Sequence, residues 1–263
     1  MAFDVETTGL VAGVDRVVEL AAVAFQGDEV LDTFSRLVNP GIPMPSAAAR
    51  VNGITDEMLA EAPPPAAALP EFLCLLRRGT PLAHNAAFDV GFVGIEAEEA
   101  GLPAPQGPVL DTRGLARRAF PGRFSYSLGN LSRDLQLEMP VAHRALADAH
   151  ACRWLFHACA RKLARDAELT IEDLARLSGA PLDFFCHAPR QPRTARLVQQ
   201  ALAQGTMVDI SYRSSGGAVT ERTIKPISFC LVGGNVAVVA FCTLRNDTRT
   251  FFLDSIAEAR AVQ

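Results

Sequence analysis

The sequence has no long uninterrupted apolar segment and no N-terminal signal. No run approaches the roughly 18 consecutive apolar residues that a membrane-spanning helix needs. The first residues do not combine a basic stretch with a long apolar one, so a secretory signal is not predicted. We therefore expect a cytoplasmic protein with no membrane as partner.

Closely spaced cysteines are also lacking. The six cysteines are scattered, and none forms a Cys-x-x-Cys pair. This spacing supports neither a zinc site nor a disulfide framework. Free thiols in a reducing compartment are the interpretation that it favours.

A strong positive charge is lacking too, since the 263 residues carry a net charge of −4, which argues against a general nucleic-acid coat protein. The charge is unevenly placed, however. Residues 1–110 hold 5 basic and 15 acidic residues, whereas residues 111–165 hold 10 basic and 4 acidic ones. The basic segment could lie along a phosphate backbone, but a solvated helical face would give the same excess.

The pattern of apolar residues predicts an α/β domain in the first part of the chain. Three strands joined by hairpin-like turns come first, followed by alternating helices and short strands, which indicates a mixed sheet. We expect strands at 3–6, 16–25, 29–38, 80–86 and 109–112, and helices at 55–62, 65–78, about 87–100 and 144–165.

A second, smaller domain is predicted at the C-terminal end. Prolines interrupt the pattern in residues 178–193, so we expect a domain at 1–165, a linker at 166–191 and a β-rich domain at 192–263. The last of these begins with one helix and continues with strand-like sequence. The helix is expected at 192–204, and the strands at 207–213, 221–229, 235–244 and 249–256.

Two acids stand one residue apart in the first strand. Asp4 and Glu6 should point to the same face, because side chains alternate along a strand. Neighbouring carboxylates repel, and burial makes each harder to ionise. A hard divalent cation such as Mg²⁺ or Mn²⁺ would relieve both effects, although a solvated strand face also explains an Asp-x-Glu pair.

Two later stretches strengthen the metal interpretation. Asp89 follows a short strand in HNAAFD (84–89), and AHRALAD (142–148) contains His143 and Asp148. Five residues on one helix turn through about 500°, which would point the last two side chains in different directions. If both serve one site, His143 lies in the loop before the helix and Asp148 lies within it.

These motifs together resemble a known family. FDVETTGL (3–10), HNAAFD and HRALAD, in this order, resemble the DEDDh 3′–5′ exonucleases, a group that includes the proofreading epsilon subunit of DNA polymerase III, ribonuclease T and oligoribonuclease. RVNGITDEML (50–59) and YSLGNLSRDLQL (126–137) resemble further family segments. The resemblance implies a ribonuclease H-like mixed-sheet α/β sandwich.

It also implies an active site. Asp4, Glu6, Asp89 and Asp148 would hold two divalent metal ions, Mg²⁺ or Mn²⁺. His143 would act as general base. The expected partner is the 3′ end of single-stranded DNA or RNA, from which nucleoside 5′-monophosphates are released.

Further residues are implied as substrate contacts. Asn52 stands where the family often has a histidine near the 3′ hydroxyl, and a core role explains Phe88 equally well. His84 and Asn85 either support the site or satisfy the end of a strand. The whole set is Thr7, Gly9, Leu10, Asn52, Ile54, His84, Asn85 and Phe88.

Residues 206–256 are similar to the WYL domain of bacterial regulators and nuclease-associated proteins. The resemblance implies Tyr212, Arg222 and Arg249 as contacts for a nucleic acid or a nucleotide-like ligand. Residues 236–238 replace the tripeptide that names the family, which weakens any stacking surface. Buried or rim positions of a small barrel explain the same three residues.

Other functions are also compatible with the sequence. A non-catalytic binding module is one, although four repelling carboxylates give such a module no benefit. A polymerase-associated proofreading subunit is another, although residues 166–205 contain no evident clamp-binding motif. Only three residues precede Asp4, so either the natural chain starts upstream or a short strand binds metal modestly. In the second case, β-branched residues added before Met1 would raise metal affinity.

Overall fold

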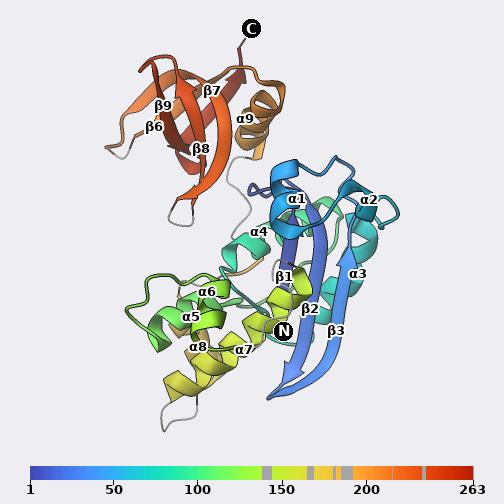
Figure 1. Cartoon of the computed structure of the whole chain (residues 1–263). Helices are drawn as coiled ribbons and strands as arrows, with labels where there is room; N and C mark the ends of the chain where they lie inside the picture. Colours follow the sequence, from blue (N-terminus) through green and yellow to red (C-terminus); the bar gives the residue numbers. More distant parts are fainter. Residues whose placement is uncertain are drawn as a thin grey trace. The chain divides into compact units, whose positions relative to one another are not determined.

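A computed structural model of the chain describes residues 1–137, 144–164, 169–179, 182–184, 192–214, 216–232 and 235–262. Two compact units make up the chain (Figure 1). The first comprises residues 1–8 and 16–188, and the second comprises residues 9–15 and 189–263.

The first unit is built on a five-stranded mixed sheet with the strand order β3-β2-β1-β4-β5. Strands β1, β2 and β3 pair antiparallel, and β4 and β5 run parallel to β1, which confirms the α/β fold class. The strands are β1 Ala2–Thr7, β2 Val17–Gln26, β3 Glu29–Leu37, β4 Leu82–Ala83 and β5 Leu110–Asp111. Strand β1 is therefore central, and both of its neighbours shield it.

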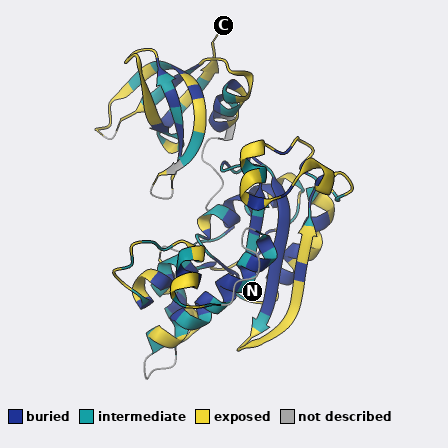
Figure 2. Ribbon diagram, viewed as in Figure 1, coloured by how far each residue is buried: buried dark blue, intermediate teal, exposed yellow. Residues whose placement is uncertain are grey.

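Helices cover this sheet. The long helix α7 packs against β1 and β2, while α3 packs against β2. The helices are α1 Ser46–Asn52, α2 Asp56–Leu59, α3 Pro65–Leu76, α4 Ala87–Glu99, α5 Thr112–Ala119, α6 Leu128–Asp134, α7 Ala145–Ala164 and α8 Ile171–Ser178. Strands β1 and β2 are mostly buried (Figure 2). Among the described residues, no helix is both long enough and apolar enough to cross a membrane.

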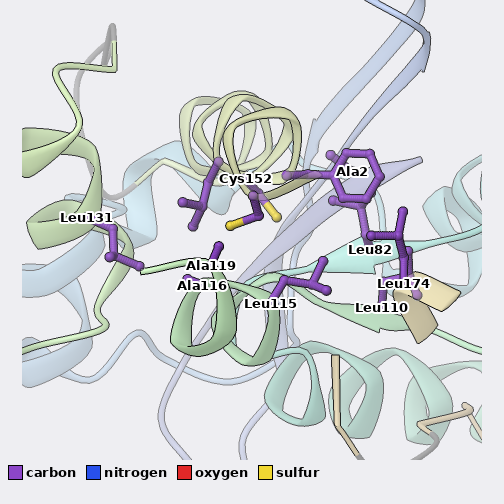
Figure 3. Close-up of a cluster of buried hydrophobic side chains, with 12 residues drawn as sticks. Ala2, Leu82, Leu110, Leu115, Ala116, Ala119, Leu131, Cys152 and Leu174 are labelled. Carbon is purple, nitrogen blue, oxygen red and sulfur yellow. The ribbon is translucent and has the colours of Figure 1, made fainter. Parts of the chain in front are cut away.

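One core cluster lies where α5 and α7 meet the strands (Figure 3). Cys152 of α7 and Leu115 of α5 are fully buried there, together with Leu82 of β4 and Leu110 of β5. Burying a leucine side chain contributes roughly 1.5–3 kcal/mol. This apolar layer fixes the start of β1 and the axis of α7, the two elements that carry the site described below.

Residues 166–191, expected as a linker, instead contain a packed helix. Helix α8 lies against α5, and a β-carbon added at Gly114 would overlap the carbonyl oxygen of Ser178. Val109 N also donates a hydrogen bond of 2.8 Å to Leu182 O. Because this packing depends on contacts between distant segments, it could not be read from local periodicity.

The second unit joins one helix to an antiparallel sheet with the strand order β10-β6-β7-β8-β9. Val198 and Ala201 of the helix are buried with apolar residues of the strands. The stretch expected as one final strand at 249–256 is divided between β9 and β10. The elements are α9 Pro192–Gln204, β6 Val208–Arg213, β7 Val219–Val232, β8 Asn235–Cys242, β9 Asp247–Phe252, a 3₁₀ turn at Leu253–Ser255 and β10 Ile256–Ala261.

The contact at Gly114 gives a first prediction. We expect Gly114→Ala to lower the free energy of unfolding by about 1–3 kcal/mol, because overpacking forces α8 away from α5. Gly129→Ala is the matched control, since a β-carbon there has open space in α6. It should leave stability unchanged or raise it by up to about 1 kcal/mol. Urea unfolding followed by the fluorescence of Trp154, which lies in α7, measures both. Equal stability of Gly114→Ala and the wild type would contradict the packing.

Candidate active site

Strand β1 displays two carboxylates on one partly open face. Asp4 and Glu6 are half-buried, whereas Val5 between them is 4% exposed and faces the core. In the pairing with β2, Asp4 lies opposite Ala21 and Glu6 lies opposite Glu19. The alternation of a strand therefore places the two acids as the sequence predicts.

Helix α7 brings a third carboxylate to the same place. Asp148 lies in the first turn of α7, which packs across β1. One carboxylate oxygen from each of Asp4, Glu6 and Asp148 can be chosen so that all three lie within 4.8 Å of one another. Three hard oxygen donors at this spacing match the ligands that Mg²⁺ and Mn²⁺ prefer.

Asp89 approaches the strand from the side of helix α4. It lies in the first turn of that helix and is 3% exposed. Its Oδ1 accepts a hydrogen bond of 3.1 Å from the backbone N–H of Val5, between Asp4 and Glu6. Asp89 is thus held against β1, although it is not one of the three residues of the 4.8 Å group.

The pKa values of these acids reflect burial and mutual repulsion. Burial raises the pKa of Asp4 well above its usual range, and the charges of Asp89, Asp148 and Glu6 raise it further. Burial, followed by the charges of Asp148 and Glu19, raises the pKa of Glu6 to about 7. Burial likewise raises the pKa of Asp89. A bound divalent cation would offset both the burial of these carboxylates and their mutual repulsion, so the donor set fits a metal ion.

Asn52 forms hydrogen bonds at the edge of this site, whereas Ile54 lies in the apolar core. Asn52 Nδ2 donates to the backbone oxygen of Thr7 at 3.4 Å, and its hydrogen bond with Glu6 lowers the pKa of that acid. Ile54 is fully buried in a cluster with Val18 and Met44. The burial favours a core role for Ile54 over the expected contact with a base.

The residues that follow β1 enter a short loop. Thr7 is buried, and Leu10 is half-buried. A β-carbon at Gly9 would overlap the carboxylate of Asp15, so a larger residue there would displace that side chain. Asp15 Oδ2 also accepts a hydrogen bond of 2.8 Å from Val11 N, which closes the loop.

His84 and Asn85 have partners within the fold. His84 Nε2 lies 2.9 Å from Tyr126 O, which can only accept, so this nitrogen is the donor. His84 Nδ1 lies 3.0 Å from Thr112 Oγ1. Asn85 adopts a left-handed backbone with φ of 63° and accepts a hydrogen bond of 2.8 Å from Arg113. Both residues therefore brace the end of β4.

The remaining predicted residues of the first unit are Phe88 and His143. Phe88 is half-buried, and its ring centroid lies 4.8 Å from that of Phe92. His143 lies outside the described residues. The predicted placement of Asp148 within the helix agrees with the observed start of α7 at Ala145.

Sequence reasoning missed a buried ion pair beside the site. Glu19 of β2 is 1% exposed, and Arg144 forms an ion pair of 2.7 Å with it. The sequence signal that could have indicated this ion pair was Glu19, a single acid in a largely apolar strand. Its partner is separated by 125 positions and could not be identified from spacing.

In the second unit, the three predicted ligand contacts have different surroundings. Tyr212 packs edge-to-face on Phe251 with centroids 5.0 Å apart, and Arg249 is exposed. Arg222 Nε donates to Thr220 Oγ1 at 3.1 Å. Of the three, only Arg222 lines an open cavity of about 450 Å³. Its lining residues are Asp209, Ser211, Glu221, Arg222, Thr223, Thr243, Leu244, Glu258 and Arg260.

Two family models match the chain. Residues 1–156 match the family model of the RNase T type, described as an exonuclease. Residues 193–261 match that of the WYL domain.

Individual proteins are similar to part of the chain. DNA polymerase III of the PolC type from Bacillus cereus is 40% identical over 153 residues, which cover 58% of this chain and 11% of that protein. The 3′–5′ exonuclease DinG from Bacillus subtilis is 36% identical over 176 residues, covering 66% of this chain and 19% of that protein. The chain thus spans less than a fifth of each of these two curated relatives.

Solved structures show the same fold. Exonuclease X in complex with 5′ overhanging duplex DNA superposes with a TM-score of 0.52 and 29% identity, covering 67% of this chain and 98% of that one. Exonuclease I of E. coli with a dA16 oligonucleotide has a TM-score of 0.51 at 17% identity, covering 91% and 54% of the two chains. At this lower identity the likeness concerns the fold alone.

The raised pKa values give a second prediction. Between the ordinary pKa of Glu6 and its folded value of about 7, the folded state binds more protons than the unfolded state. Without divalent metal, the free energy of unfolding should therefore fall as pH rises through this window, by at most roughly 3 kcal/mol for this group. Glu6→Gln should reduce the slope, and Mn²⁺ should stabilise more at pH 8 than at pH 6.

Asp32→Asn is the control, because Asp32 is half exposed and pairs with Arg78 on the surface. It should leave the dependence of stability on pH and Mn²⁺ unchanged over this range. Chemical unfolding in chelator and in Mn²⁺ measures these quantities. A flat pH profile in chelator, identical in wild type and Glu6→Gln, would contradict the electrostatic account.

Proposed function

The chain belongs to the RNase T exonuclease family, and on this premise we propose that its first unit is a metal-dependent 3′–5′ exonuclease. The substrate is the 3′ end of a single-stranded nucleic acid, and the product is a nucleoside 5′-monophosphate. The observation that carries the proposal is the convergence of Asp4, Glu6 and Asp148 on one partly open face.

The carboxylates define which residues would hold the metal ions. Asp4, Glu6 and Asp148 offer oxygens at ligand spacing, and Asp89 is held beside them by Val5 N–H. Divalent ions bound there would supply an activated water and charge stabilisation for the departing oxygen. Mg²⁺ and Mn²⁺ both suit such carboxylates.

The surrounding residues orient the ligands and handle the proton. Asn52 hydrogen-bonds Glu6 and the backbone of Thr7, which fixes the Glu6 side chain at the end of β1. We assign His143 as the general base that takes the proton of the attacking water, because a neutral imidazole suits this task near pH 7. In the sequence His143 directly precedes Arg144, and the helix that carries Asp148 begins at the next residue, Ala145.

Charge and aromatic exposure support a nucleic-acid substrate. Helix α5 and the loop after it expose Arg117, Arg118 and Phe124. Arginines neutralise phosphates, and an exposed aromatic ring can stack on a base of any sequence. The similarity to exonuclease X, solved with 5′ overhanging duplex DNA, supports a recessed or free 3′ end.

A proofreading role is a second candidate, favoured by the similarity to PolC-type DNA polymerase III. In that role the enzyme would remove a mismatched nucleotide from a primer end. The second unit is then an accessory domain whose nucleotide-like ligand stays a prediction. Its cavity presents Asp209, Glu221 and Glu258 beside two arginines, so an anion must meet acidic groups there as well.

The proposal predicts stepwise shortening of a 5′-labelled oligonucleotide in Mg²⁺ or Mn²⁺. Asp4→Asn and Asp148→Asn should each lower the rate by at least roughly 10²-fold, because each removes a charged ligand. Asp32→Asn should retain the wild-type rate. Parallel reactions on single-stranded DNA, duplex DNA, short RNA and a mismatched primer identify the substrate. Undiminished shortening by both site variants would overturn the assignment.

His143 gives a separate prediction. We expect His143→Gln to lower kcat by about 10²–10⁴-fold, as loss of a general base does. Mn²⁺ affinity should be retained, because His143 is not assigned as a ligand. The limb of the pH–rate profile that reports a neutral imidazole should also disappear. Calorimetry and single-turnover rates between pH 5.5 and 8 measure these effects, and an unchanged acidic limb would exclude His143 as the base.

A further inference from the structure

Glu19 is an unusual residue for its position. It is the one charged side chain in strand β2, and it is 1% exposed. In the strand pairing it lies directly opposite Glu6. Like charges opposite each other on neighbouring strands destabilise a sheet, and the charge of Glu19 raises the pKa of both Asp4 and Glu6.

The carboxylate of Glu19 is fully engaged with the start of helix α7. Arg144 Nε donates to Oε2 at 3.0 Å, and Arg144 Nη2 donates to Oε1 at 2.7 Å. The backbone N–H of Ala145, the first helical residue, donates to Oε2 at 3.0 Å. A bidentate arginine pair is among the stronger hydrogen-bonded contacts in proteins. A helix N-terminus also leaves N–H groups that favour an anion.

This contact links the two elements that carry the metal ligands. Strand β2 pairs with β1 along the stretch that displays Asp4 and Glu6. Arg144 lies one turn before Asp148, whose N–H donates to Arg144 O at 3.1 Å. Glu19 therefore fixes the first turn of α7 to the strand pair from which the other two carboxylates project.

We propose that Glu19 and Arg144 are positioning residues, which together hold Asp148 at ligand distance from Asp4 and Glu6. Neither residue of the pair is assigned a contact with the reacting atoms. The pair acts by fixing the placement of α7. For catalysis the inference rests on the proposed function, but metal binding tests it without turnover.

An electrostatic effect and a positioning effect predict opposite changes in metal affinity when Arg144 is replaced. Removal of a positive charge beside a cation site should tighten metal binding if the effect is electrostatic alone. Loss of positioning should weaken it. We expect Arg144→Met to lower Mn²⁺ affinity by about tenfold or more, the range seen when supporting residues around metal ligands are removed. Arg144→Lys, which keeps the charge and loses the bidentate contact, should fall between Arg144→Met and the wild type.

Glu19→Gln and the double variant complete the test. Glu19→Gln should also lower Mn²⁺ affinity, and the double variant should bind no worse than the weaker single one, because both changes break the same contact. The KM for an oligonucleotide should change less than the metal concentration needed for half-maximal rate. Arg123→Met is the control, since Arg123 forms an ion pair of 2.6 Å with Asp134, and neither residue is an assigned metal ligand.

Calorimetry with Mn²⁺ on the 263-residue chain is the decisive measurement, with circular dichroism to verify that each variant is folded. Unchanged or higher affinity in Arg144→Met would overturn the positioning role. If the wild type binds Mn²⁺ and degrades the oligonucleotide, such a result refutes this inference alone. If the wild type does neither, the proposed function itself fails.

Discussion

Repulsion among half-buried carboxylates is the constraint around which the first unit is arranged. Asp4, Glu6 and Asp148 come close enough to share a cation, and burial together with the neighbouring acidic charges makes Asp4 and Glu6 harder to ionise. Left alone, these groups would move apart or take up protons. They stay together because rigid elements hold each of them: a central strand and the first turn of a long helix.

The apolar core resists that repulsion. Phe3 and Val5 alternate with the acids along β1 and are buried on the other face of the sheet, so the strand cannot slip by one residue without exposing them. Cys152 and Leu155 pack the same helix that presents Asp148. The functional face therefore brings like charges together while the opposite face is well packed, and local rules are commonly broken in this way at functional sites.

Periodicity predicted most of this framework, since strands of alternating residues and a long amphipathic helix leave local signals. The segment 112–119 was missed because it is short and rich in arginine. The segment 171–178 was missed although Thr170 and Asp173 form a capping box, which is a local helix signal; only its packing on Gly114 is a long-range contact. The resemblance assigned the acids, yet it could not decide the burial of Ile54. Nor could it pair Glu19 with Arg144, because contacts between distant positions are set by the folded sheet.

Glu19 shows why a residue that weakens a site locally can still serve it. By charge alone it disfavours the ionised forms of Asp4 and Glu6, so an apolar residue at that position would relieve them. An apolar residue, however, could not accept the N–H of Ala145 or the two hydrogen bonds of Arg144. The guanidinium of Arg144 in turn lowers the pKa of Glu6, which partly cancels the repulsion from Glu19. The pair therefore adds little net charge to the site and contributes mainly the fixed position of a helix.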